Sequence, residues 1–344
     1  MSEAEVLFET RGRAGIVTLN RPKALNALTL DMIREIHPVL ERWAGDDRIG
    51  HVIVRAAGGK AFCAGGDIRK LYDWGREGHR IFLRFYWEEY RLNAAIKRFP
   101  KPYVALLDGI TMGGGVGLSV HGSHRVASER LTFAMPETGI GLFPDVGGTY
   151  FLPRCPGETG LYLGLTGARL KVADALHAGI ATHHVPSDRL DALTDALCAT
   201  GDVDGTVGDF CAEAGDAPLV DRREEIDRHF GRDSVEAILE SLDADGGDWA
   251  ENTAETVRGK SPTSLAIAYR QLREGAEKGF EDCMRLEYRI VNRIFRGHDF
   301  YEGIRAVVID KDLAPCWDPP VLEAVDPNDI ARYFAPLDEE LSFD

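Results

Sequence analysis

Two carboxylates share an apolar, glycine-rich segment near the middle of the chain. Glu137 and Asp145 stand in residues 135–148 (MPETGIGLFPDVGG), among glycines, prolines and apolar side chains. A carboxyl group in such surroundings loses hydration, which raises its pKa toward a range that suits acid or base catalysis. Taken singly, Glu137 could be a helix-start carboxylate and Asp145 a turn residue. The pattern makes Glu137 a candidate general base or nucleophile.

Two glycine-rich turns could supply hydrogen-bond donors to a reacting oxygen. Gly65 and Gly66 lie in residues 60–69 (KAFCAGGDIR), and a second run, 113–115 with Gly117, follows a β-prone segment. Glycine lets a ligand approach the backbone closely, and amides at a helix start favour a developing oxyanion. The alternatives are a tight turn at the first site and close helix packing at the second. Neither run matches a dinucleotide-binding or P-loop pattern.

The elements that must position these segments alternate between strand and helix up to about residue 150. An N-terminal hairpin is predicted from two short β-prone runs, and a helix should begin after Thr29, its N-cap. The predicted strands are 5–10, 14–19, 51–56, 103–107 and 123–133, with a second helix across 79–98. This alternation predicts a layered α/β core in which helices cover the sheet.

Helical patterns dominate the rest of the chain. They take over from about residue 157, with one short strand candidate at 181–185, and Ser261 and Pro262 are expected to start one of the helices. We therefore expect an α/β core over residues 1–200 and a mainly helical C-terminal region over residues 201–344.

Charge and hydropathy exclude two classes of partner. The 344 residues include 40 Lys and Arg against 56 Asp and Glu, a net charge of −16 that repels nucleic acid. No apolar run approaches the roughly 20 residues that cross a bilayer, so we expect no membrane insertion. The opening segment lacks the features of a signal peptide and is too acidic for a mitochondrial presequence. We therefore expect a cytoplasmic protein.

Metal binding is not indicated by the sequence. His121 and His124, and the pair His183 and His184, lack further ligands at the spacing of a metal site. The cysteines form no C-x-x-C pair. We expect no metal.

Four segments together resemble the enoyl-CoA hydratase/isomerase (crotonase) family in order and spacing. They are NRPKALNAL (20–28), KAFCAGGDI (60–68), GGGVG (113–117) and the block 135–148. The block DFYEGIRAVVIDKDLAPCW, near the C-terminus, resembles a thioesterase branch of that family. The resemblance implies a spiral of repeated ββα units followed by helices, and it implies an acyl-CoA substrate.

The resemblance also assigns roles to individual residues. The backbone amides of Gly66 and Gly114 correspond to the oxyanion hole that holds the thioester carbonyl. Glu137 corresponds to the catalytic glutamate of the family, and Asp145 to an acid that is characteristic of the thioesterase branch. Glu89 falls at a position that contacts the substrate in that branch, although a solvated helix carboxylate is the alternative for it.

The CoA portion is expected near the two N-terminal motifs. The resemblance places the adenine near Lys23, Ala24, Ala64, Asp67 and Ile68. Basic residues in the same motifs could offset the negative net charge locally and receive the CoA phosphates: Arg21, Lys23, Lys60, Arg69 and Lys70. A solvated surface is the alternative for each of these cations.

One departure from the family's hydratases decides between reactions. Those enzymes carry a second glutamate three residues after the middle glycine of the GGG run, where this chain has Gly117. We therefore expect hydrolysis of a short 3-hydroxyacyl-CoA, with 3-hydroxyisobutyryl-CoA of valine breakdown as the leading substrate and no cofactor beyond the CoA of the substrate. The alternatives are a hydratase or isomerase, and a non-catalytic acyl-CoA-binding protein. A homo-oligomer is compatible with the resemblance.

Overall fold

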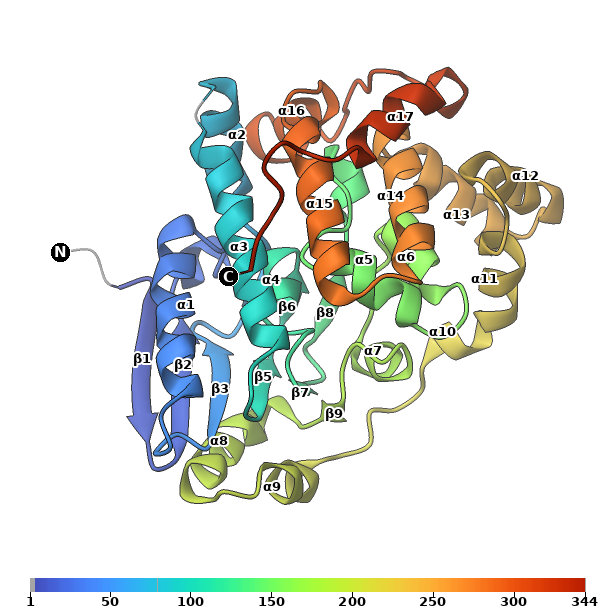
Figure 1. The fold of residues 1–344 in the computed structure, drawn as a ribbon. Coiled ribbons are helices and arrows are strands. Elements are labelled where there is room, and N and C mark those ends of the chain that lie inside the picture. The colour runs from blue at the N-terminus through green and yellow to red at the C-terminus, as the bar shows by residue number, and fades with distance from the viewer. Residues whose placement is uncertain (1–3, 79, 344) are drawn as a thin grey trace. The chain divides into compact units, whose positions relative to one another are not determined.

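The computed structural model describes residues 4–78 and 80–343 (Figure 1). Its chain divides into two compact units. The first unit comprises Met1–Asp67, Arg91–Ala134 and Arg169–Val220. The second comprises Ile68–Tyr90, Met135–Ala168 and Asp221–Asp344. The two units therefore alternate along the chain. The expected border near residue 200, drawn from the helical patterns of the sequence, does not coincide with a border between these units. The division into regions 1–200 and 201–344 stays a prediction.

The first unit is built on a six-stranded sheet with the order β1-β2-β3-β5-β7-β9. Its strands are β1 (Val6–Arg11), β2 (Ala14–Leu19), β3 (His51–Ala56), β5 (Tyr103–Leu107), β7 (His124–Ala127) and β9 (His183–His184). β1 pairs antiparallel with β2, which confirms the predicted hairpin, and every other pair is parallel. Parallel neighbours need a crossover connection, and α1 (Leu30–Ala44) lies in the one between β2 and β3.

A second sheet of three short parallel strands accompanies the first. It contains β4 (Ala61–Cys63), β6 (Ile110–Met112) and β8 (Thr132–Ala134) in that order. Each follows directly, along the chain, a strand of the large sheet: β4 follows β3, β6 follows β5 and β8 follows β7. The repeated step, one strand in each sheet and then a helical segment, confirms the predicted spiral of ββα units. The segment 123–133 is accordingly two strands rather than one, because residues between β7 and β8 carry the chain from one sheet to the other.

The core of the first unit forms where two helices cover the large sheet. Leu190, Leu193 and Leu197 of α8 (Leu190–Ala199) pack in one buried cluster with Ile16, Ile53, Val104 and Val126 of four neighbouring strands. Val203 and Val207 of α9 (Val203–Phe210) belong to the same cluster. Burial on both faces explains why these strands read as continuous apolar runs rather than alternating ones.

The second unit is mainly helical within the part of the chain that the structure describes. Its longer helices are α2 (Ile68–Arg76), the first part of α3 (Ile81–Lys97), α6 (Thr159–Thr166), α11 (Arg223–Phe230), α12 (Val235–Asp245), α13 (Asp248–Arg258), α14 (Pro262–Gly275), α15 (Phe280–Ile294) and α17 (Pro327–Phe334). The shorter ones include η2 (Glu137–Ile140), α5 (Gly148–Phe151) and α16 (Asp299–Ile304). α14 packs against α5 and α6, α15 packs against α5 and α17, and α16 packs against η2.

Two helix starts follow the predicted capping chemistry. The Thr29 hydroxyl accepts a hydrogen bond from the Met32 amide at 3.2 Å, and the Ser261 hydroxyl accepts one from the Ser264 amide at 3.0 Å. Pro262 stands at the first position of α14, where its missing N–H costs nothing. The helix expected across 79–98 is observed from Ile81 to Lys97, and residue 79 lies outside the described residues.

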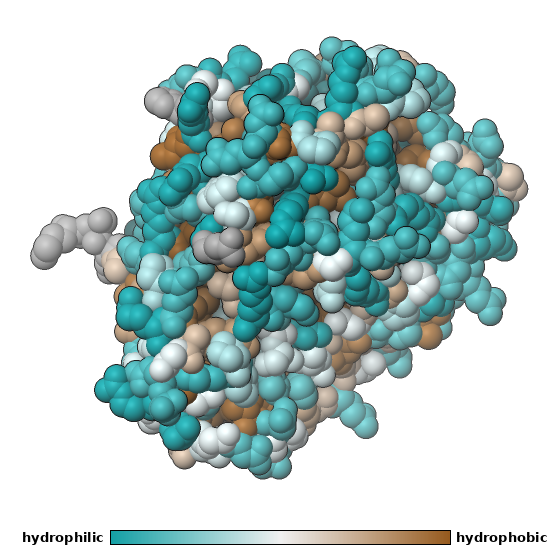
Figure 2. All heavy atoms as spheres, viewed as in Figure 1, coloured by the Kyte–Doolittle hydropathy of each residue, from teal (hydrophilic) through white to brown (hydrophobic). Residues whose placement is uncertain are grey.

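One face of the molecule is mostly hydrophilic. On the face shown in Figure 2, hydrophilic residues predominate and hydrophobic residues appear in small groups. Among the described residues, no helix is both long enough and apolar enough to span a bilayer.

Candidate active site

In each of the two glycine turns of the first unit, a glycine with a positive φ comes directly before the predicted oxyanion-hole residue. Gly65 (φ +111°) precedes Gly66, and Gly113 (φ +45°) precedes Gly114 at the start of α4 (Gly114–Gly117). A positive φ at the preceding residue is readily available only to glycine. Within the described part of the chain, the backbone N–H groups of Gly66 and Gly114 have no hydrogen-bond acceptor. Both amides are therefore free to donate to a ligand.

The fold places these two turns side by side. Cys63 and Thr111 are partners in the parallel pairing of β4 and β6, which end just before the turns. A Cβ atom on Gly115 would lie 2.2 Å from the Cys63 carbonyl oxygen, a separation that real atoms do not reach. Position 115 must therefore be glycine for the second turn to pack against the first. The GGG run thus serves close packing and also leaves the Gly114 amide free, so the two interpretations of this run are compatible.

The residues expected to contact CoA in the first unit also lie together. The Ala64 amide donates to the Leu25 carbonyl at 3.1 Å, and the Asp67 amide donates to the Leu28 carbonyl at 2.9 Å. These bonds hold the segment that carries Lys23 and Ala24 against Ala64 and Asp67. Lys23 and Ala24 are exposed, whereas Ala64 and Asp67 are half-buried. Ile68, the remaining predicted contact, begins α2 in the second unit.

Arg21 has a different role from the one its charge predicts. Its guanidinium pairs with the carboxylates of Glu5 and Asp67, each at 3.0 Å, and donates to the Ala27 carbonyl. These contacts stabilise the loop of residues 20–28 and leave Lys23 and Lys60 exposed. Arg21 therefore stabilises the loop instead of presenting a free cation to a phosphate.

The predicted acids meet in the second unit. Glu89 on α3, Glu137 on η2 and Asp145 are buried, with at most 4% of each residue exposed. The Tyr90 hydroxyl donates to Asp145 Oδ2 at 2.9 Å. Among the described residues, Glu89 Oε1 and Glu137 Oε2 have no hydrogen-bond partner. Unpaired buried oxygens are costly, and they are the groups expected to receive a substrate or water.

A fourth buried acid, Glu287 on α15, completes this cluster. It is fully buried, and its carboxylate accepts hydrogen bonds from the amides of Gly147 and Thr149, both at 2.9 Å. Glu287 is not among the site residues predicted from the sequence. Its signal was present, because Glu287 stands on the apolar face of α15 between Met284 and Val291, where a solvated carboxylate has no place.

Burial dominates the electrostatics of the four acids. Loss of hydration, reinforced by the charge of Asp145, raises the pKa of Glu137 well above its ordinary value and that of Glu287 to about 8. Burial likewise raises the pKa of Asp145 to about 7, an increase that the Tyr90 hydrogen bond opposes. The pKa of Glu89 is raised by burial and by Asp145. The cluster can therefore hold and exchange protons near neutral pH.

The turn that carries Glu137 is tightly packed against α16. A Cβ atom on Gly141 would lie 2.1 Å from the Asp299 carbonyl oxygen, and one on Gly303 would lie 2.4 Å from the Ile140 carbonyl carbon. The Ser261 amide donates to the Thr138 carbonyl at 3.1 Å, and the Ser261 hydroxyl donates to Asp299 Oδ2. The start of α14 and the whole of α16 thus fix the backbone around Glu137.

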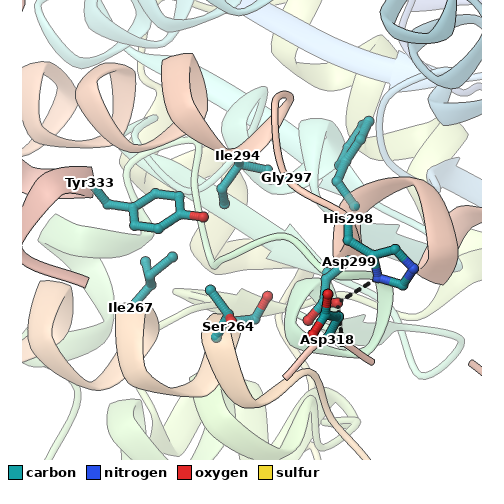
Figure 3. Close-up of a pocket in the computed structure, with 11 residues that line it drawn as sticks. Ser264, Ile267, Ile294, Gly297, His298, Asp299, Asp318 and Tyr333 are labelled. Carbon is teal, nitrogen blue, oxygen red and sulfur yellow. Dashed lines mark hydrogen bonds and ion pairs between the residues drawn. The ribbon is translucent and has the colours of Figure 1, made fainter. Parts of the chain in front are cut away.

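Asp299 also lines a cavity of about 170 Å³ beside this turn (Figure 3). Its carboxylate accepts from the Asp318 amide at 2.8 Å and lies 3.1 Å from His298 Nδ1. Ser264, Ile267, Ile294 and Tyr333 line other parts of the same cavity. The Asp299 oxygens are already used by the protein, so this carboxylate is part of the framework.

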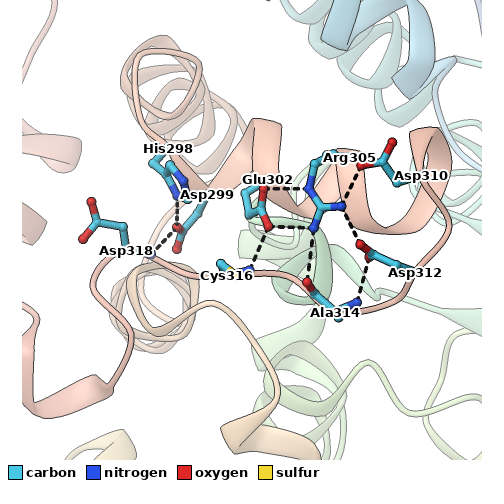
Figure 4. A network of polar contacts seen from close by, with 9 residues as sticks. All are labelled: His298, Asp299, Glu302, Arg305, Asp310, Asp312, Ala314, Cys316 and Asp318. Carbon is cyan, nitrogen blue, oxygen red and sulfur yellow. Dashed lines mark hydrogen bonds and ion pairs between the residues drawn. The ribbon is translucent and has the colours of Figure 1, made fainter.

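An arginine holds the segment that follows α16 (Figure 4). The Arg305 guanidinium pairs with Glu302, Asp310 and Asp312, and it donates to the Ala314 carbonyl at 3.1 Å. Asp310 and Asp312 are therefore paired within this segment, which follows the helix that packs against the Glu137 turn.

No group of three or more His, Cys, Asp or Glu residues in the described ranges could hold a metal ion. His124 instead pairs with Asp204 at 2.8 Å, and its ring stacks on that of His183.

Comparisons with known proteins give this geometry a context. Residues 14–334 match the family model described as enoyl-CoA hydratase/isomerase. The chain is 50% identical to the mitochondrial 3-hydroxyisobutyryl-CoA hydrolase of Danio rerio, over 98% of this chain and 91% of that protein. It is 48% identical to the human protein of the same name, over 97% of this chain and 89% of the relative.

Two solved structures have closely similar folds. One is titled a carnitinyl-CoA dehydratase from Mycobacterium thermoresistibile, with a TM-score of 0.95 and 41% identity over 99% of both chains. The other is titled an enoyl-CoA hydratase from Rhodobacter sphaeroides 2.4.1, with a TM-score of 0.93 and 42% identity over 99% of this chain and 100% of that one.

These comparisons correct one expectation. The curated relatives are named as mitochondrial enzymes, so the expectation of a cytoplasmic protein is wrong. That expectation rests on the composition of the opening residues. Targeting segments are read and removed separately from the folded chain, so the composition of a folded chain does not determine its location.

The packing of Gly303 against the Glu137 turn predicts a specific loss of stability. Gly303→Ala should lower the free energy of unfolding by about 1 to 3 kcal/mol, because the new methyl group overlaps the Ile140 backbone. Urea unfolding would measure the change. Gly208→Ala is the control, since nothing lies within 4 Å of the added methyl group in α9 and alanine favours helix. Equal stability of the two variants would contradict the packing described here.

Proposed function

The chain belongs to the enoyl-CoA hydratase/isomerase family, and on this premise we propose that it is a thioesterase. Its substrate is 3-hydroxyisobutyryl-CoA or a similarly short 3-hydroxyacyl-CoA, which water cleaves to the free hydroxy acid and CoA. The names of relatives at about 50% identity support this assignment. A place in valine catabolism follows from that substrate. The reaction needs no cofactor beyond the CoA of the substrate.

The observation that carries the proposal is the position of the second acid. Gly117 stands where the family's hydratases carry a second glutamate, and it lies within α4 of the first unit. The acids that accompany Glu137 are instead Asp145, Glu89 and Glu287, all buried in the second unit. The chain therefore lacks the second glutamate of the hydratases, and the buried acids near Glu137 support hydrolysis instead.

The free amides of Gly66 and Gly114 are the proposed oxyanion hole. Attack on a thioester carbonyl places negative charge on its oxygen, and two preoriented N–H groups stabilise that charge without rearranging. A positive φ at Gly65 and at Gly113, directly before the two amides, supports this role, because glycine adopts it readily.

Glu137 is the proposed base or nucleophile. Burial raises its pKa, so its ionised form is a stronger base than a solvated carboxylate, and its Oε2 has no partner within the described residues. Two routes fit these properties. Glu137 either activates water or attacks the thioester to form an acyl-enzyme anhydride. Incorporation of ¹⁸O from labelled water into the Glu137 carboxylate in a single turnover distinguishes the second route from the first.

Asp145 and Glu89 are proposed to bind the reacting part of the substrate. Asp145 has a pKa of about 7, so it can either supply a proton to the leaving thiolate or accept a hydrogen bond from the 3-hydroxyl. Glu89 Oε1 lacks a partner in the described chain and can accept a hydrogen bond from the substrate. For the CoA portion we retain the predicted contacts Lys23, Ala24, Ala64, Asp67 and Ile68. The exposed cations Lys23 and Lys60 are proposed to bind the CoA phosphates.

A direct assay separates this function from its alternative. Release of free thiol from saturated 3-hydroxyisobutyryl-CoA requires a thioesterase, whereas a hydratase would form or consume a 2-enoyl-CoA and leave the thioester intact. The titles of the two solved structures favour testing both reactions. Absence of thiol release across a panel of short 3-hydroxyacyl-CoAs, with interconversion of enoyl- and hydroxyacyl-CoA, would establish the alternative.

The first catalytic prediction concerns Glu137. Glu137→Gln should abolish thiol release while CoA affinity stays within a few-fold of wild type, because an amide of equal size can neither activate water nor attack the thioester. Steady-state kinetics and CoA binding would measure the two effects. Turnover within a few-fold of wild type would remove Glu137 from its assigned role.

The stability of the same variant relative to wild type should increase as pH rises. The pKa of Glu137 is raised in the folded state, so folding binds a proton that the unfolded chain releases above about pH 4. This burial therefore opposes folding increasingly between about pH 4 and the raised pKa, and glutamine removes that penalty. We expect the advantage of the variant in urea unfolding to be larger at pH 8 than at pH 4.

A second prediction tests the role of Asp145. Asp145→Asn should lower turnover more on 3-hydroxyacyl-CoA than on an analogue without the hydroxyl, since a hydrogen bond to a charged group is worth about 1.5 to 3 kcal/mol. Comparing kcat/KM for the two substrates measures the difference. Equal losses on both would assign Asp145 to proton transfer to the leaving thiolate.

A third prediction tests the oxyanion hole. Gly114→Pro should raise the activation free energy by about 3 kcal/mol or more, because proline has no N–H and the oxyanion loses one of two donors. Circular dichroism and CoA affinity must match wild type for the kinetic result to count. A folded variant with full activity would show that the oxyanion is held elsewhere.

A further inference from the structure

The backbone directly after Asp145 adopts an unusual conformation. Val146 has a φ of +49° although it is β-branched and buried, and Gly147 follows with a φ of +87°. β-Branched residues rarely occupy this region, and such outliers persist only where surrounding contacts hold them. The orientation of Asp145 therefore depends on whatever fixes the two following residues.

Two side chains from the C-terminal helices hold this segment on both sides. Glu287 of α15 uses both carboxylate oxygens, Oε2 accepting from the Gly147 amide and Oε1 from the Thr149 amide, each at 2.9 Å. Gln271 of α14 donates from Nε2 to the Pro144 carbonyl at 2.6 Å. The peptide group before Asp145 and the one between Val146 and Gly147 are thus each bonded to a fully buried side chain.

A charged residue is an unfavourable choice for Glu287 if its purpose is only to stabilise the fold. Taking a carboxylate out of water is costly, and a second carboxylate, Asp145, lies close enough to raise the pKa of Glu287. A single carboxylate can, however, accept from two neighbouring amides at once, whereas a glutamine would direct its NH₂ group at one of them. The desolvation cost of Glu287 and its hydrogen bonds to two amides together indicate that this residue has a role in the site.

We propose that Glu287 is a positioning residue for the thioesterase reaction. It fixes the backbone of Gly147 and Thr149, keeps Val146 in its left-handed conformation and so holds the Asp145 carboxylate against the Tyr90 hydroxyl. Glu287 acts through Asp145 and does not itself touch the substrate. This inference rests on the proposed function, because it assigns a supporting role in that same reaction.

The test is Glu287→Gln in the full chain, with Asp282→Asn as the matched control. Asp282 is an exposed carboxylate on the same helix, paired only with Arg285 among described residues. We expect Glu287→Gln to lower kcat at least tenfold with KM within threefold of wild type, and Asp282→Asn to leave both unchanged. Hydrogen exchange should become faster at the Gly147 and Thr149 amides of Glu287→Gln and stay unchanged elsewhere. A kcat within twofold of wild type would overturn the proposal.

A double variant separates positioning from general destabilisation. If Glu287 acts through Asp145, adding Glu287→Gln to Asp145→Asn should cause no further loss of kcat, because the group that it positions is already disabled. Losses that multiply would overturn the proposal. If Glu287→Gln does not fold, Glu287→Asp serves in its place: it keeps the charge but is too short to reach both amides, so kcat should fall several-fold with the same change in exchange. Wild-type kcat from Glu287→Asp would also overturn the proposal.

The wild-type enzyme distinguishes failure of this inference from failure of the proposed function. Absence of thiol release by wild type would reject the thioesterase assignment. Normal thiol release by both wild type and Glu287→Gln would reject only the role of Glu287.

Discussion

Burial of four carboxyl groups in one part of the second unit is the constraint on which the proposed chemistry depends. Glu89, Glu137, Asp145 and Glu287 lose hydration together, and the charge of Asp145 raises the pKa of the others. Such a group of acids opposes folding, so other interactions must offset it. In return the cluster retains protons at neutral pH, which a solvated pair of carboxylates cannot do.

The helices of residues 261–304 supply the contacts that keep the acids in place. Glu287 and Gln271 hold the backbone on either side of Asp145, while Ser261 and α16 hold the Glu137 turn. These helices come long after the catalytic segment in the sequence, and in the described structure they pack directly against it. The C-terminal region is therefore part of the catalytic framework of its own unit.

Features that depend on residues close in sequence could be predicted, whereas features that depend on contacts between distant segments could not. The Thr29 and Ser261 caps, the N-terminal hairpin and the glycine turns each depend on residues close in sequence. The division of 123–133 into β7 and β8 was missed, because only the second sheet reveals it. Glu287 was missed because its partners, Gly147 and Thr149, lie far away in sequence. The free amides of Gly66 and Gly114 agree with the predicted hole, whose role remains a prediction.

The alternation of the two units along the chain has a consequence for how the protein folds during synthesis. The first unit cannot be completed before Val220 has been made, and the second needs its own early segments together with residues 221–344. Many contacts are therefore distant in sequence, which slows folding and leaves apolar segments such as β5 exposed on the ribosome until late. Truncation near residue 200 would remove part of both units, so neither half of this chain should fold alone.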